Sequence, residues 1–323
     1  MTEFIPSTEM LNGCIEPTAE DILAFATYAE SHTSNFHVLG AEQYAEGQIV
    51  PFDDPILQKW LDERIEYASQ KRIKIIQPAE CFINQSKLGS CSGASGTSGQ
   101  MCSIYNHRYF GIPALFERLN CSIAYLKARG RWGGGLAISA MQRTLMEFGN
   151  ASVKSAGEYS IQAPRTIQGF DNLEHQIWTT NCENKKQVVK FLKAGVAVAF
   201  GSHTCPQIVR RGRAISWRKA NHAMQCSGYN HDTNNEFFGL YRWHNTWGKI
   251  YDDLENGWGC WLDDSELDRF SMFGRFGLPY AIFGAEFKLG ISPQILAASN
   301  PFRLPFSNQL PKKLEEIKNS YVV

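Results

Sequence analysis

The sequence has no apolar run long enough to cross a membrane and no excess charge of either sign. Its longest apolar runs, such as Val196–Phe200, fall far short of the roughly 20 residues that a membrane-spanning helix needs. Met1–Gly13 contains no basic start followed by an apolar stretch, so no secretory signal is recognised. Thirty-two Lys and Arg balance thirty-two Asp and Glu. We therefore expect a soluble, unsecreted protein with neither nucleic acid nor a membrane as partner.

Disulfide and metal frameworks are also missing. The nine cysteines are odd in number and have no regular spacing. A chain of 323 residues can bury a large core without disulfide bonds, so we expect reduced cysteines in a reducing compartment such as the cytoplasm. There is no pair of closely spaced Cys-x-x-Cys units, and the eight histidines are scattered. The sequence therefore predicts no metal site and no cofactor.

Three segments differ in composition. Residues 1–75 are polar, with apolar residues at helix-like spacing around Glu20–Glu30 and Pro55–Gln70, and are expected to form an arm or an added helical subdomain. Residues 76–290 carry the motifs described below. Residues 291–323 form a tail that contains several prolines. Both end segments could contact other proteins in an assembly.

The segment 76–290 has helical patterns first and strand patterns later. The expected helices are Ile104–Asn120, the stretch from Ile138 to Phe148, and Lys185–Lys193. The expected strands are Val196–Phe200, Ala223–Tyr229, Phe237–His244 and Trp258–Leu262. An α+β fold is predicted, with a helical lobe at about residues 76–165 and a β lobe at about residues 166–290.

Cys91 is the candidate nucleophile. Small residues precede it, and Gln85 lies six positions earlier. If Cys91 opens a helix, its backbone N–H and the Gln85 side-chain amide can point at one carbonyl oxygen and form an oxyanion hole. The N-terminus of the same helix would favour the thiolate over the thiol.

His222 and Asn245 are the candidate partners of Cys91. His222 precedes Ala223 and an apolar run, which suggests a strand that faces a cleft, and its imidazole could exchange a proton with the thiol and the leaving amine. The amide oxygen of Asn245 could orient that imidazole, and Trp247 could shield their hydrogen bond from water.

Three blocks of sequence resemble the signatures of papain-like cysteine peptidases, in the same chain order. They are Gln85-x5-Cys91, Asn221-His222-Ala223 and Asn245-Thr246-Trp247-Gly248. His222 lies 131 positions after Cys91, within the roughly 130–150 residues typical of that family. The resemblance covers about Ile76 to Gly290.

The resemblance implies two lobes, one helical and one barrel-like and antiparallel, with the active-site cleft between them. It implies a thiol hydrolase that cleaves peptide or isopeptide bonds through a thioester on Cys91. Gly134 and Gly135 would bind the backbone of an extended peptide, and Ala223 would line a substrate pocket. Leu88 stands where secreted members often carry a disulfide cysteine, which agrees with a reduced protein.

One stretch departs from the family pattern. The run Ser92–Gly99 follows the nucleophile and has poor helix propensity, which disfavours a well-formed helix there. Residues 1–75 resemble a pro-segment in position, and the sequence leaves open whether they block the cleft.

Each candidate residue also has a structural interpretation when taken alone. Cys91 and His222 could be buried core residues, Asn245 a turn residue, and the glycines of 134–135 a simple loop. Two other functions stay open. The fold could serve as a structural or docking component of a large assembly such as a virus particle, which would make the chain virion-associated. It could also be an amidase that acts on cell-wall peptides.

Overall fold

The computed structural model describes residues 5–32, 49–111, 116–131, 133–159 and 177–283. The tail predicted at residues 291–323 lies outside these ranges. The α-helices in the described part are α1 Thr8–Leu11, α2 Ala19–His32, α3 Pro55–Gln70, α4 Cys91–Asn106, α5 Ser122–Arg129, α6 Ile138–Glu147, α7 Val153–Ala156, α8 Lys185–Lys193 and α9 Asp264–Leu267. The strands are β1 Leu119–Asn120, β2 Ala151–Ser152, β3 Trp178–Asn181, β4 Ala197–Arg210, β5 Arg213–Tyr229, β6 Tyr241–His244, β7 Gly259–Leu262 and β8 Tyr280–Phe283.

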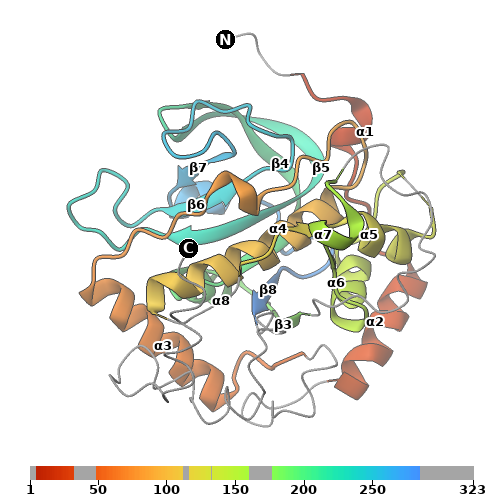
Figure 1. Cartoon of the computed structure of the whole chain (residues 1–323), viewed down its shortest axis with the longest axis horizontal. Helices are drawn as coiled ribbons and strands as arrows, with labels where there is room; N and C mark the ends of the chain where they lie inside the picture. The colour runs from red at the N-terminus through yellow and green to blue at the C-terminus, as the bar shows by residue number, and fades with distance from the viewer. Residues whose placement is uncertain (1–4, 33–48, 112–115, 132, 160–176, 284–323) are drawn as a thin grey trace.

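The strands form a six-stranded sheet in the order β3-β8-β4-β5-β6-β7, with antiparallel neighbours throughout. β5 also pairs with β7 at one position, so this end of the sheet curls on itself. Figure 1 shows α4 running through the middle of the molecule, between this sheet and helices α5 and α6. The predicted α+β fold, with a helical part and a sheet part, is confirmed.

Alternation along β4 explains how the sheet packs on both faces. Val198 and Phe200 belong to the same core cluster as the apolar side chains of α3 and α8. Ala197 and Ala199 alternate with them along the strand and belong to the clusters that contain residues of α4. Because neighbouring residues in a strand face opposite sides, α4 covers one face of the sheet, and the small alanines let it approach closely.

The central hairpin of the sheet is longer than the sequence predicts. β4 and β5 pair from Val198–Cys226 to Arg210–Arg213, around a two-residue turn at Arg211 and Gly212. Both turn residues have positive φ, 46° and 75°, as in the tight turns that match the twist of antiparallel strands. The polar outer half of this hairpin has no continuous apolar run, so only its inner half was expected.

The glycine-rich stretch after Cys91 forms a regular helix in spite of its poor helix propensity. The whole first half of α4 is buried. Side chains on three glycines would collide with neighbours: an ideal Cβ would lie 2.7 Å from Tyr280 Oη at Gly96, 2.8 Å from Ile282 Cδ1 at Gly99 and 3.2 Å from Tyr125 at Gly93. Close packing on three sides therefore outweighs the low intrinsic propensity of these residues.

The helix predicted over Ile104–Asn120 is wrong beyond Asn106. A 3₁₀ turn follows at His107–Phe110 and ends at Gly111, whose φ is 67°. The buried Asn106 side chain donates to two carbonyl oxygens of the sheet part, at 2.8 and 2.9 Å, which fixes the end of α4 there. Leu119–Asn120 is the short strand β1, paired with β2.

α3 connects the predicted N-terminal segment to the rest of the molecule. Its N-cap, Asp54, accepts hydrogen bonds from the first-turn amides, and Pro55 occupies the first helical position, as favoured there. The buried Arg64 guanidinium lies 3.6 Å from the Phe110 ring centre, and its Nε donates to the Ala194 carbonyl at 2.7 Å. No helix in the described residues is both long and apolar enough to span a membrane.

Candidate active site

Cys91 is the first residue of α4, with Ser90 at the N-cap position. Its side chain is fully buried. Its sulfur accepts a hydrogen bond from the backbone N–H of Ala223 in β5, at 3.3 Å. Burial raises the pKa of the thiol to about 12, although the Ala223 amide and the first amides of α4 act in the opposite direction. In this state Cys91 is a neutral thiol.

His222 lies next to Ala223 in β5 and is oriented by Asn245. Its Nε2 is 2.7 Å from Asn245 Oδ1, and the Trp247 ring stacks on the imidazole with centres 4.5 Å apart. Burial lowers the pKa of His222 to about 4, with the Asn245 hydrogen bond acting against it, so the ring is neutral. The bond assigns the proton to Nε2 and leaves Nδ1 as an acceptor, which has no hydrogen-bond partner among the described residues.

Gln85 is hydrogen-bonded to Thr246, which follows Asn245 in the chain. Its backbone N–H donates to the Thr246 carbonyl at 2.8 Å, and Thr246 Oγ1 donates to its side-chain oxygen. Its side-chain Nε2 donates to the Leu88 carbonyl at 2.7 Å. One amide hydrogen of Gln85 is therefore used locally in this state, and the other is available for a further acceptor.

A segment near the N-terminus lies against Cys91, at the place where the sequence left open whether the cleft is blocked. An ideal Cβ on Gly13 would lie only 2.9 Å from Cys91 Sγ. The next residue, Cys14, donates its N–H to the Asn221 carbonyl at 3.0 Å, immediately before His222. Residues 12–15 therefore lie between the start of α4 and β5. We call them the occluding residues.

The glycine loop before α6 forms the other wall around the occluding residues. Leu136 N–H donates to the Gly13 carbonyl at 3.1 Å, and Ile15 N–H donates to the Leu136 carbonyl at 3.5 Å, which is a parallel bridge centred on Cys14. Gly135 lies against this segment, since its ideal Cβ would be 2.8 Å from Ile15 Cγ2. Gly134 N–H donates to Glu9 Oε1 at 3.3 Å. The predicted glycine pair thus contacts an extended segment, and Leu136 makes the main backbone pairing.

The structure brings together Cys91, His222, Asn245, Gln85, Trp247 and Ala223, together with the glycine pair 134–135. Sequence reasoning missed Glu9, Gly13, Gly89 and Leu136, which lie against the same site. Glu9, Gly13 and Leu136 belong to no motif, and Gly89 is an unspecified position within the Gln85-x5-Cys91 block. Only the occurrence of Gly13 and Gly89 in short glycine-containing turns could have hinted at close backbone approach.

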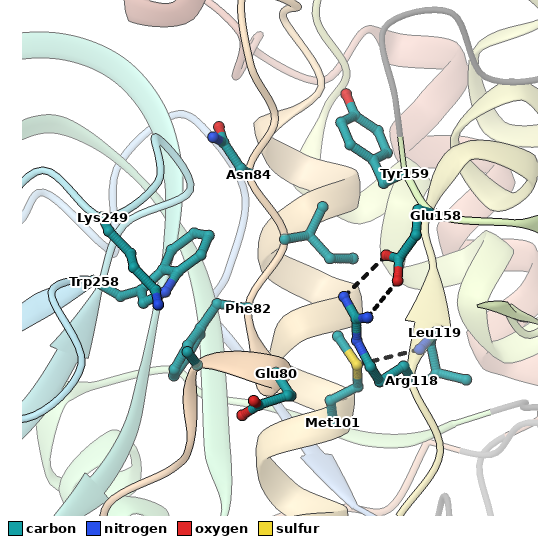
Figure 2. Close-up of a pocket in the computed structure, with 12 residues that line it drawn as sticks. Glu80, Phe82, Asn84, Met101, Arg118, Leu119, Glu158, Tyr159, Lys249 and Trp258 are labelled. Atoms are coloured by element: carbon teal, nitrogen blue, oxygen red, sulfur yellow. Dashed lines mark hydrogen bonds and ion pairs between the residues drawn. The ribbon is translucent and has the colours of Figure 1, made fainter.

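A pocket of about 380 Å³ opens next to the Gln85 segment (Figure 2). Phe82 and Trp258 form one wall, and the Arg118–Glu158 ion pair forms part of the other. Tyr159 also lines the pocket, and its hydroxyl is hydrogen-bonded to Ser90 Oγ at 2.6 Å. The pocket therefore adjoins the residue before Cys91 without containing the Cys91–His222 pair.

All nine cysteines lie in the described part of the chain, where they are free and buried. No group of three or more His, Cys, Asp or Glu side chains within the described ranges is placed to hold a metal ion.

No family model matches the sequence, and no curated protein matches it. Three solved structures of cysteine proteases are similar to it at 16% identity. The clostridial protease Cwp84 after propeptide cleavage has a TM-score of 0.45, over 64% of this chain and 54% of that one. Xylellain from Xylella fastidiosa has 0.39, over 62% and 81%. The ragweed pollen allergen Amb a 11, in its proform, has 0.40, over 66% and 63%.

The matched part of this chain spans about half the length of Cwp84.

Proposed function

We propose that the chain is a thiol hydrolase that cleaves peptide or isopeptide bonds, with Cys91 as nucleophile and His222 as general acid and base. Asn245 orients the imidazole, and Gln85 with the Cys91 backbone N–H stabilises the oxyanion. The observation that carries the proposal is the His222 ring itself. Its Nε2 is hydrogen-bonded to Asn245 Oδ1 at 2.7 Å, and its Nδ1 has no hydrogen-bond partner among the described residues. The next residue, Ala223, donates its backbone N–H to Cys91 Sγ.

The occluding residues suggest that this is a latent state. The Gly13 carbonyl accepts from Leu136 N–H and lies 3.1 Å from an ideal Cβ on Gly135, so it is directed toward the glycine loop. The backbone carbonyl oxygen of Asn12 also faces the glycine loop, 3.4 Å from an ideal Cβ on Gly135. We therefore interpret residues 12–15 as an inhibitor in cis that covers Cys91 without presenting a carbonyl for attack.

Withdrawal of residues 12–15 would let water and substrate reach Cys91. Burial is the main cause of both the raised pKa of Cys91 and the lowered pKa of His222, so solvation brings the two pKa values toward each other. The thiol proton can then pass to His222 Nδ1, giving a thiolate and an imidazolium. The helix N-terminus stabilises the thiolate.

The proposed reaction has two halves. The thiolate attacks the scissile carbonyl, and the tetrahedral oxyanion accepts hydrogen bonds from the Cys91 backbone N–H and the free Gln85 amide hydrogen. Collapse breaks the C–N bond as His222 protonates the leaving amine, which leaves a thioester on Cys91. A water molecule, deprotonated by His222, then hydrolyses the thioester and restores the thiol.

The test compares peptide hydrolysis by the full chain, a Gly13→Ala variant and the same variant with Cys91→Ala. The Gly13 substitution is expected to open the site, because its Cβ has no room beside Cys91. Hydrolysis of a mixed peptide library, followed by mass spectrometry, should appear in the opened variant and vanish when Cys91 is lost. Equal hydrolysis with and without the Cys91 thiol would refute the proposal.

A further inference from the structure

Two backbone amides from opposite walls of the site meet at one oxygen atom. Gly89 N–H donates to Glu9 Oε1 at 3.0 Å, and Gly134 N–H donates to the same oxygen at 3.3 Å. Gly89 belongs to the segment that leads into Cys91, whereas Gly134 belongs to the loop before α6. Two amide donors aimed at a single point form an anion-binding arrangement, in which a carboxylate makes charge-assisted hydrogen bonds.

The position of these amides requires glycine. Gly134 has a φ of 87°, in the left-handed region, and neighbouring Gly133 has a φ of 80°. An ideal Cβ on Gly133 would lie 3.1 Å from Glu9 Oε1, and one on Gly89 would lie 3.0 Å from Gly135 N. Side chains at these positions would therefore crowd the bound carboxylate or push the walls apart.

Positive charge lies beside the two amides. An ideal Cβ on Gly134 would be 3.5 Å from Arg129 Nη2 and 3.6 Å from Arg131 Nη2, so both guanidinium groups border the loop. Arg129 is also the last residue of α5, and its buried Nε has no hydrogen-bond partner among the described residues. Both cations therefore lie at the Gly134 end of the amide pair, from which a bound carboxylate can be attracted.

The anion-binding point lies close to the nucleophile. An ideal Cβ on Gly89 would be 3.3 Å from Glu9 Cγ and 3.4 Å from Gly13 Cα, and Gly13 in turn touches Cys91 Sγ. Glu9 and Gly13 therefore both lie against Gly89, two residues before Cys91. A substrate side chain that reaches this point belongs to the residue that donates the acyl group.

We propose that Gly89 N–H and Gly134 N–H, with Arg129 and Arg131, form a carboxylate subsite that Glu9 occupies in the latent chain and an acidic substrate residue occupies during cleavage. The inference rests on the proposed function and adds a substrate class to it: peptides with Glu or Asp as the acyl-donating residue. Glu9 then anchors the occluding residues by using the subsite of the substrate.

The test measures binding, so that it does not depend on turnover. Full-length Gly13→Ala protein is treated with iodoacetamide, and peptide mapping follows alkylation of Cys91 in the presence of acetylated tetrapeptide amides that end in Glu or Gln. The Glu peptide is expected to protect Cys91 at about tenfold lower concentration, because charge-assisted hydrogen bonds replace neutral ones. Equal protection by both peptides would overturn the proposal.

Variants that remove positive charge test whether Arg129 and Arg131 cause the preference for Glu over Gln. Arg129→Gln together with Arg131→Gln should bring the Glu-to-Gln ratio close to one. Arg143→Gln, which removes the same charge from α6 where Arg143 pairs with Glu147, should leave the ratio unchanged. A preference for Glu that survives loss of both arginines would place the carboxylate elsewhere and refute the assignment.

Two further readouts keep the proposal falsifiable. If Gly13→Ala does not fold, Glu9→Gln in the full chain replaces it, since loss of the carboxylate should also expose Cys91 to iodoacetamide. Peptide hydrolysis is measured on the same samples. Selective protection without hydrolysis would support the subsite and contradict the proposed activity, whereas hydrolysis without selectivity would do the reverse.

Discussion

Replacing Gly13 by alanine is expected to release the occluding residues from Cys91. The new Cβ would lie 2.9 Å from Cys91 Sγ, 3.0 Å from Gly89 Cα and 3.1 Å from the Gly89 carbonyl carbon. Favourable contacts between carbon atoms are about 3.5–4.0 Å long, so each of these is too short. Two of the three atoms belong to the backbone and cannot rotate away. The steric strain is therefore relieved most readily when the occluding residues move away from Cys91.

The size of the effect follows from that strain. Adding a methyl group to a well-packed site costs about 1–3 kcal/mol. If this cost is relieved when residues 12–15 withdraw, the open population rises about 5-fold to 150-fold. The rate at which iodoacetamide alkylates Cys91 should rise by the same factor as long as opening and closing are fast relative to alkylation.

The assay is peptide mapping of alkylated protein at a series of times. Mapping is needed because all nine cysteines are free and buried. Ile5→Ala serves as the matched control, because Ile5 lies in the same segment with an exposed side chain. If Gly13→Ala remains folded and its Cys91 reacts no faster than in the control, residues 12–15 do not govern access, and the latent state is not supported.

Three other predictions concern the site and its support. His222→Ala in the opened variant should lower kcat by about 10²–10⁴-fold without preventing alkylation of Cys91, and an unchanged kcat would exclude His222 as acid and base. Burial lowers the pKa of His222 to about 4, below its unfolded value of about 6.5, so the unfolded chain takes up the proton first on acidification. The free energy of unfolding of the latent chain, measured in urea, should thus contain a contribution from His222 that is fully present above pH 6.5. This contribution falls by up to about 1.4 kcal/mol per pH unit toward pH 4, and His222→Gln should reduce that slope. Asp253→Asn should destabilise the fold by about 3–5 kcal/mol, because it leaves the buried Arg242 guanidinium without its ion pair, whereas Glu147→Gln on the surface should have little effect.

The reacting groups could be predicted from the sequence because each belongs to a short block of fixed spacing. Gln85 and Cys91 are distant in the chain from His222 and Asn245, and the structure brings the two pairs to one place. The resemblance of those blocks to a known family supplied the link that local patterns lack. The four strands predicted from apolar runs overlap β4, β5, β6 and β7, although β6 begins only at Tyr241. β3 and β8 were not predicted.

The remaining features depend on long-range packing. α4 forms in a run of glycine and serine because Tyr125, Tyr280 and Ile282 close around it, which local propensity does not register. The occluding residues have an ordinary composition, and their place beside Cys91 depends on backbone hydrogen bonds and on the missing side chain of Gly13, which only the packed structure reveals. Glu9 is likewise one acidic residue among many until Gly89 and Gly134 are seen to face it.

The covalent connection between the occluding residues and the rest of the chain affects how latency can be relieved. A tethered segment acts at an effective concentration in the millimolar range for a short flexible connection, and this value does not change when the protein is diluted. Dilution therefore cannot activate the protein, and a free competitor must match that local concentration. Activation requires an event on the segment itself, such as its cleavage or its capture by another surface.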